Sequence, residues 1–219
     1  MFRGFQVVCL LFFLAALSYS QAIPAGTSVT FTLDFPESQP GHYSLLVQSD
    51  GKAHYESSGK VSSQSDDVDS YAYDFTMSPA TRDKIFDLAA KAGYFQKDLD
   101  SHRKNMAFTG RKTLAYKDGQ RSSESTFNYT PSATAAELTN LFQGLSDTLE
   151  LGHRLEYSLR YQKLALAEEL KHTEDRGRLN PPVEIQAIAP ILQQIVADAS
   201  VMNVTRARAQ RLLETPAGH

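Results

Sequence analysis

The sequence predicts an α+β protein in which an antiparallel sheet, built from two hairpin-helix units, is followed by a C-terminal helical segment of about three helices. Three observations favour this fold class. Apolar and polar residues alternate with a period of two in several stretches before residue 130, which indicates strands with one buried face. Two Asp-Gly pairs, Asp50-Gly51 and Asp118-Gly119, each stand between strand-like stretches. After residue 150, apolar residues recur only at helical spacing.

The first 22 residues have the order of a secretory signal peptide. A basic start precedes an uncharged apolar run from Val7 to Leu17, and two small residues, Ser20 and Ala22, precede the expected cut. The run is shorter than the roughly 20 residues that span a membrane. We therefore expect residues 1–22 to be removed and the protein to be exported, either periplasmic or secreted.

The mature chain lacks cysteine, because the single cysteine, Cys9, lies inside the signal-like segment. An exported chain without cysteine cannot use disulfides, so a packed core has to stabilise it, and a bacterial envelope or secreted protein is favoured. The whole chain carries a formal net charge of −3 at pH 7. Neither half of the mature chain is basic enough for a nucleic-acid-binding face, and neither has an apolar run of membrane-spanning length. We expect a soluble protein with no nucleic-acid partner.

The first unit begins with a strand over residues 28–35, in which apolar and polar residues alternate. A hairpin over residues 42–57 follows, because glycine in Asp50-Gly51 tolerates the positive φ of a tight turn. Residues 62–70 are polar and acidic, which predicts a loop, and residues 71–77 alternate again as a strand.

The helix of the first unit lies in "SPATRDKIFDLAAKAGYF", residues 78–95. Ser78 can cap its start, Pro79 suits the first helical position and Gly93 suits the exit. The buried stripe has spacings of three and four residues and consists of Ile85, Leu88, Ala89 and Ala92.

The second unit repeats this order, with a hairpin about Asp118-Gly119 and a capped helix that opens at Pro131. The two Asp-Gly pairs are 68 residues apart, whereas Pro79 and Pro131 are 52 apart, so the first unit carries 16 more residues between turn and helix. A diverged duplication and a chance recurrence of a common local design both explain the repeat.

The domain organisation expected from these patterns is a signal peptide over 1–22, a sheet domain over 23–150 and a helical region over 151–219. The helical region should contain one helix from Leu151 to about Leu170, a second kinked at Pro190, and a last one after a turn near Ser200. These helices could pack on the sheet, on each other, or against a second copy of the chain as a homo-oligomer.

The stretches "YSLLVQSDGKAHYESSGKV" and "SPATRDKIFDLAAKAGYF" resemble a family of uncharacterised exported bacterial domains, in which an Asp-Gly hairpin leads to a helix that ends near a Tyr-Phe pair. The resemblance covers about residues 41–150. It implies a hairpin-plus-helix domain and export, and it assigns no activity and no role to any residue.

Sequence motifs predict no catalytic residue and no cofactor. The chain has no G-x-G-x-x-G or G-x-x-x-x-G-K phosphate loop, no G-x-S-x-G elbow and no H-E-x-x-H zinc motif. The one candidate metal cluster is Asp98, Asp100 and His102, whose alternate spacing would place three ligands on one side of an extended segment. The competing interpretation is a solvated loop after the first helix.

Strand tyrosines allow two interpretations. They could form an aromatic recognition surface on an open sheet face, or they could simply fit a half-buried face of the sheet. The residues are Tyr43, Tyr55, Tyr71, Tyr73, Tyr116 and Tyr129.

These observations favour an exported, non-catalytic binding or interaction module of the cell envelope or secreted fraction, whose partner is an unknown protein or envelope component. One alternative is a hydrolase-type enzyme with a site assembled from distant residues, and another is an oligomeric structural protein paired through its C-terminal helices. An enzyme should show a pocket with convergent polar groups and carboxylates of shifted pKa, whereas a binding module should show an apolar or aromatic patch on the sheet.

Overall fold

The structure is a computed structural model that describes residues 23–60, 68–177 and 181–215. The signal-like segment 1–22 and most of the acidic stretch 62–70 lie outside the described residues.

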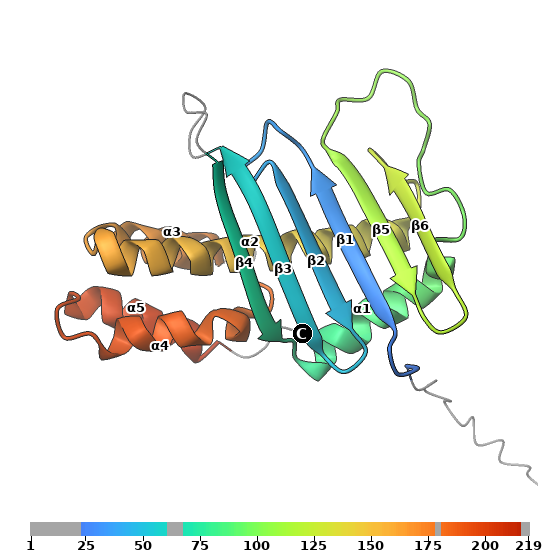
Figure 1. The fold of residues 1–219 in the computed structure, drawn as a ribbon. Helices are drawn as coiled ribbons and strands as arrows, with labels where there is room; N and C mark the ends of the chain where they lie inside the picture. Colours follow the sequence, from blue (N-terminus) through green and yellow to red (C-terminus); the bar gives the residue numbers. More distant parts are fainter. Residues whose placement is uncertain (1–22, 61–67, 178–180, 216–219) are drawn as a thin grey trace, which may run out of the picture.

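One antiparallel sheet of six strands forms the centre of the fold, in the order β4-β3-β2-β1-β5-β6 (Figure 1). The fold class expected from the sequence is confirmed. Chain order gives β1 (Ser28–Asp34), β2 (His42–Gln48), β3 (Lys52–Lys60), β4 (Val68–Thr76), α1 (Pro79–Lys91), a 3-10 turn η1 (Gly93–Phe95), β5 (Arg111–Lys117), β6 (Ser122–Phe127), α2 (Ala133–Tyr161), α3 (Ala165–Gly177), η2 (Ile185–Ile188), α4 (Ala189–Ala197) and α5 (Asn203–Leu213).

Strand β1 joins the two hairpin units. It pairs with β2 on one side and β5 on the other, so that Phe31 stands opposite both Leu45 and Leu114. All three side chains are fully buried. The first strand therefore supplies the shared middle of the core, and each hairpin extends the sheet outward from it.

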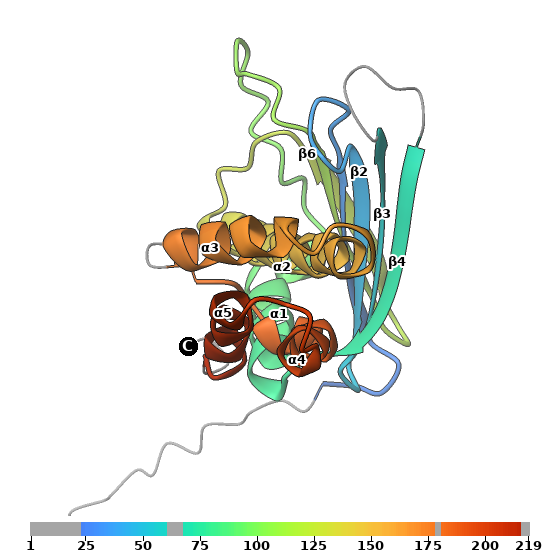
Figure 2. The same cartoon turned by 90° about the vertical axis from the view of Figure 1, so that its left-hand side faces the viewer.

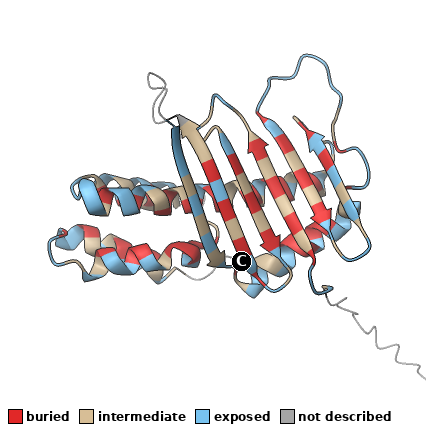
Figure 3. Ribbon diagram, in the orientation of Figure 1, coloured by how far each residue is buried: buried red, intermediate tan, exposed pale blue. Residues whose placement is uncertain are grey.

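The helices lie on one face of the sheet, and the opposite face is open (Figure 2). Buried residues alternate with partly exposed ones along the central strands (Figure 3), as the period of two predicted. On the covered face the ring of Phe31 stacks on Phe142 of α2, with centroids 5.3 Å apart and planes at 10°. The partly exposed residues of the open face are mostly small and polar, among them Thr30, Thr32 and Thr113.

The strand tyrosines belong to the covered face. Tyr43, Tyr55 and Tyr116 are at most 4% exposed, and Tyr71 and Tyr73 are half-buried against the same core. Of the two interpretations, a half-buried sheet face is therefore correct for these five tyrosines and an aromatic surface on the open face is wrong, because the helices cover the side of the sheet that carries the rings. Tyr129 lies beyond the end of β6 and is 50% exposed.

The two Asp-Gly pairs form different turns. At the first, Gly51 has a positive φ of 90°, as the sequence predicted for a tight hairpin. At the second, Gly119 is not left-handed, and the Asp118 carboxylate instead accepts hydrogen bonds from the backbone of Gln120 and Arg121 at 2.7 and 2.6 Å. The same dipeptide therefore forms a turn with a left-handed glycine at the first site and a turn held by the aspartate side chain at the second.

Helix α1 follows its sequence signals closely. Ser78 caps it by accepting a hydrogen bond from the Thr81 backbone, Pro79 lies in the first turn, and Gly93 leaves it with a φ of 69°. Helix α2 begins later than expected, because Ser132 rather than Pro131 precedes its first turn and accepts from the Ala135 backbone.

Helix α2 crosses the expected domain boundary. It runs without a break for 29 residues, so residues 150 and 151 lie inside one helix. The first helix expected beyond Leu151 is divided between the end of α2 and α3, with a break after Gln162, whose φ is −144°. Pro190 lies in the first turn of α4, after the 3-10 turn, instead of kinking a longer helix.

The C-terminal helices pack on the rest of the chain. The Glu184 carboxylate, only 3% exposed, accepts hydrogen bonds from the backbone and the hydroxyl of Ser78, both at 2.8 Å. The Tyr73 hydroxyl donates to the Ala187 carbonyl at 2.9 Å. The apolar stripes of α3, α4 and α5 are buried within this one chain, at Leu166, Leu170, Leu192, Ile195, Ala209 and Leu212. No helix among the described residues combines the length and apolarity needed to cross a membrane.

A glycine on α2 sets how closely the C-terminal segment approaches. A Cβ at Gly152 would lie 2.6 Å from Cγ2 of the buried Ile188. We predict that Gly152→Ala lowers the free energy of unfolding by about 1–3 kcal/mol through overpacking, even though alanine in a helix interior would alone raise it by about 1 kcal/mol.

The measurement is urea unfolding, with Gly119→Ala as the control. A Cβ at Gly119 meets nothing within 4 Å, so this variant should stay within about 0.5 kcal/mol of the wild type. A Gly152→Ala protein as stable as the wild type would show that the segment does not contact α2 here.

Candidate functional site

A cavity of about 600 Å³ lies on the covered side of the sheet, between the ends of β3 and β4 and the second half of α2. The β1–β2 loop and α3 complete its wall. The side chains that carry its chemistry are Ser57, Asp69, Tyr71, Glu150, His153 and Arg154. They come from three elements that are distant in the sequence, as the site of an enzyme or a ligand-binding protein usually is.

Glu150 projects from α2 into the floor of the cavity, where its side chain is 14% exposed. One carboxylate oxygen, Oε1, accepts hydrogen bonds from the Tyr55 hydroxyl at 2.8 Å and the Ser57 hydroxyl at 2.6 Å. Ser146 completes the network by bonding to the Tyr55 hydroxyl at 2.9 Å. Burial alone would raise the pKa of Glu150, but His153, Ser57 and Tyr55 stabilise the ionised form and hold the pKa below its usual value.

His153 lies one helical turn from Glu150, between two carboxylates. Its Nδ1 is 3.8 Å from Oε2 of Glu150, and its Nε2 is 3.8 Å from Oδ2 of Asp69 on β4. The imidazole stacks on the Tyr71 ring with centroids 4.1 Å apart and planes at 7°. Glu150 raises the pKa of His153 against the opposing effect of burial, and Asp69 adds to the rise.

A second charge pair forms part of the wall. The Arg154 guanidinium donates to the Glu169 carboxylate of α3 at 3.2 Å. This pair joins α2 to α3 across the helix break and balances its own charge. The cavity therefore contains a neutralised pair in the wall and a histidine between two carboxylates on the floor.

The arrangement is suited to holding polar groups more than to nucleophilic catalysis. The Ser57 hydroxyl donates to a carboxylate, not to the imidazole, so the serine-histidine pairing of acyl-transfer enzymes is not formed by these two residues. Residues 57–60 have the S-x-x-K spacing of some serine hydrolases. Ser57 lies on strand β3, however, and the helical turn that brings such side chains together is not present there.

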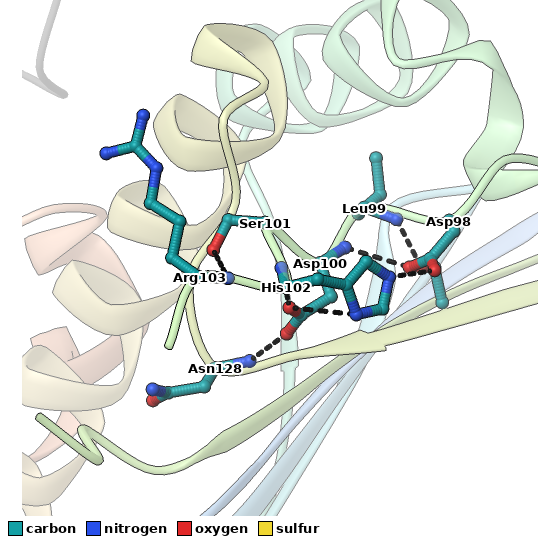
Figure 4. Close-up of polar contacts among 8 residues, drawn as sticks. Asp98, Leu99, Asp100, Ser101, His102, Arg103 and Asn128 are labelled. Carbon is teal, nitrogen blue, oxygen red and sulfur yellow. Dashed lines mark hydrogen bonds and ion pairs between the residues drawn. The ribbon is translucent and has the colours of Figure 1, made fainter. Parts of the chain in front are cut away.

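The candidate metal cluster forms a folded loop after α1 (Figure 4). The His102 ring lies 2.6 Å from Asp98 and 3.7 Å from Asp100. Backbone N–H groups donate hydrogen bonds to both carboxylates: Asp98 accepts from the Asp100 backbone, and Asp100 accepts from the backbones of His102 and Asn128. In the part of the chain that the structure describes, no group of three or more His, Cys, Asp or Glu side chains could hold a metal ion. These residues order the loop.

Comparison with known proteins finds neither a protein-family model nor a curated protein that matches this chain.

Sequence reasoning missed the residues of the cavity. Asp69, Glu150 and His153 meet only because β4 packs beside α2, and no spacing along the chain reveals that contact. One partial signal existed: Glu150 and His153 are three residues apart, and the apolar stripe of Leu145 and Leu149 continues through Leu155. Reading this stripe as one helix would have placed both polar side chains together.

The histidine should make stability depend on pH. Because its pKa is raised above the ordinary 6.5, the Glu150–His153 interaction is fully present below that pH and is lost as pH rises through the raised pKa. Glu150 must be ionised, which holds above its ordinary 4.5. The stabilising effect should therefore be greatest between these values.

We predict that His153→Gln lowers the free energy of unfolding on the order of 1 kcal/mol in this window and less at high pH. Urea unfolding across the pH range measures the difference, with His172→Gln, an exposed residue of α3, as the control. A difference that grows as pH rises from neutral would contradict this electrostatic assignment.

Proposed function

We propose that the protein is an exported binding module, periplasmic or secreted, that holds a polar group of an envelope component in the cavity beside α2. The observation that carries the proposal is the convergence of Asp69, Glu150 and His153, from β4 and α2, on one cavity of about 600 Å³. Export is supported by the signal-like order of residues 1–22 and by the resemblance to exported bacterial domains.

The binding site proposed here differs from the surface expected from the sequence. The covered position of the strand tyrosines removes the aromatic patch, and the described residues of the open sheet face are mainly small and polar. The cavity offers what a polar ligand needs: fixed acceptors, a histidine and an aromatic wall. Glu150 is held in place by Tyr55 and Ser57 before any ligand arrives, which lowers the entropic cost of binding.

A hydrolase is the second candidate, and two observations favour it. A cavity with convergent polar groups is the feature expected of an enzyme, whereas a binding module was expected to show a patch on the sheet. A histidine with a raised pKa beside a buried carboxylate is a common acid-base arrangement. Against it, both ring nitrogens of His153 face carboxylates, and the Ser57 hydroxyl is directed to Glu150. A binding role requires no rearrangement of these contacts.

The proposal is tested by thermal unfolding of the purified protein with a panel of sugars, amines and short peptides. We predict that a ligand of the cavity, at about 100 times its dissociation constant, stabilises the protein by about 2.7 kcal/mol. Glu150→Gln should weaken its binding at least about tenfold, since one charged acceptor is lost.

The matched control is Glu137→Gln on the same helix, where the side chain is exposed and pairs with Lys84 at 3.1 Å. It should bind like the wild type. A ligand that binds Glu150→Gln and wild type equally would place the binding site elsewhere, and turnover of a ligand would favour the hydrolase.

A further inference from the structure

We propose that the cavity takes a ligand with a primary ammonium group, which is attracted by the carboxylates of Glu150 and Asp69 on either side of His153. This inference rests on the proposed function and adds the chemical class of the ligand. Its basis is the charge of the cavity, the distances around His153 and the ring of Tyr157 beside them.

The charges that line the cavity favour a cation. Arg154 and Glu169 neutralise each other at 3.2 Å. Among the described residues that line the cavity, the charges of Asp69 and Glu150 then remain, with His153 between them. The floor is therefore negative whether the imidazole is neutral or protonated, and an anionic ligand would be repelled.

Carboxylate oxygens line the cavity where an ammonium group could reach them. The two distances from His153 to the carboxylates, 3.8 Å each, are too long for hydrogen bonds. Oε1 of Glu150 accepts from Tyr55 and Ser57, so among the contacts of the described residues Oε2 is the oxygen left for a ligand. An ammonium group has three N–H donors and no acceptor, which suits a cavity lined by carboxylate oxygens.

The aromatic residues suit the rest of such a ligand. Tyr157 lines the cavity, and it is 54% exposed. Its ring can cover the alkyl chain next to an ammonium group or attract the cation through its face. The Tyr71 ring is stacked on the imidazole and supports the floor from the strand side.

Binding a cation should release the proton of His153. The charged and titratable groups that face this ring are Asp69 and Tyr71 from β4 and Glu150 and Glu156 from α2, with the Arg154–Glu169 pair alongside. A bound cation would neutralise the charges of Glu150 and Asp69 that stabilise the imidazolium, and would itself repel the imidazolium, so the pKa of His153 would fall. Affinity should therefore rise with pH.

The test compares Nα-acetyl-lysine amide with its Nε-acetylated form, which has the same chain without the charge, by isothermal titration calorimetry. Nα-acetyl-glutamate amide and N-acetylglucosamine serve as anionic and neutral polar probes. We expect the lysine derivative to bind at least about tenfold more tightly than any of the others. Its affinity should increase from about pH 6 to about pH 8 in the wild type and not in His153→Gln.

Asp69→Asn is the decisive variant, because Glu150 also holds β3 whereas the Asp69 side chain is 58% exposed. It should weaken binding of the lysine derivative about tenfold and, at a pH where His153 is neutral, leave the melting temperature of the free protein unchanged. Glu137→Gln should change neither.

Two outcomes overturn the inference. If a neutral or anionic probe binds in the cavity as tightly as the lysine derivative, the proposal of a cationic ligand is wrong, while the proposed binding function is supported. If the lysine derivative does not bind at about 10 mM, the proposal of a cationic ligand is also wrong. The proposed binding function is then supported only if N-acetylglucosamine or another polar compound binds and Glu150→Gln weakens that binding.

Discussion

The packing of α2 across the covered face of the sheet is the constraint on which the rest of this structure depends. Phe142 stacks on Phe31 near one end of the contact, and further along the helix the Glu150 carboxylate is fixed to Tyr55 and Ser57 of β3. Side chains on one unbroken helix have fixed positions relative to each other. An apolar contact and a polar one therefore act together to select a single register of helix on sheet.

The same helix creates the candidate site. Its first part covers the core with apolar side chains such as Leu138 and Leu145. Its second part lies along the β3–β4 end of the sheet, where Glu150 and His153 meet Asp69. A buried carboxylate is costly without partners, and here two hydroxyls and an imidazole stabilise it. The geometry that holds the helix in place also arranges charges around the cavity.

Local patterns predicted the strands and α1 well, because alternation and capping are properties of short segments. Ser78 and Gly93 take the positions that their side chains and backbone favour. The boundary expected at residue 150 followed from the end of strand signals, but Leu149, Leu151 and Leu155 continue the stripe of one helix. Period-two alternation placed Tyr43 on the same face as Leu45, and this apolar face is the one that the helices cover. The contacts that form the site could not be predicted from local patterns, because Tyr55 and Glu150 are 95 residues apart in the sequence.

A double-mutant cycle of Tyr55→Phe and Glu150→Gln, measured by urea unfolding, tests the register of α2 most directly. Each change removes one partner of the same buried hydrogen bond, so the double variant should be less destabilised than the sum of the single variants. The account predicts a coupling free energy on the order of 1 kcal/mol. Effects that add to within about 0.5 kcal/mol would show that the two residues are independent, and that α2 does not lie on β3 in this register.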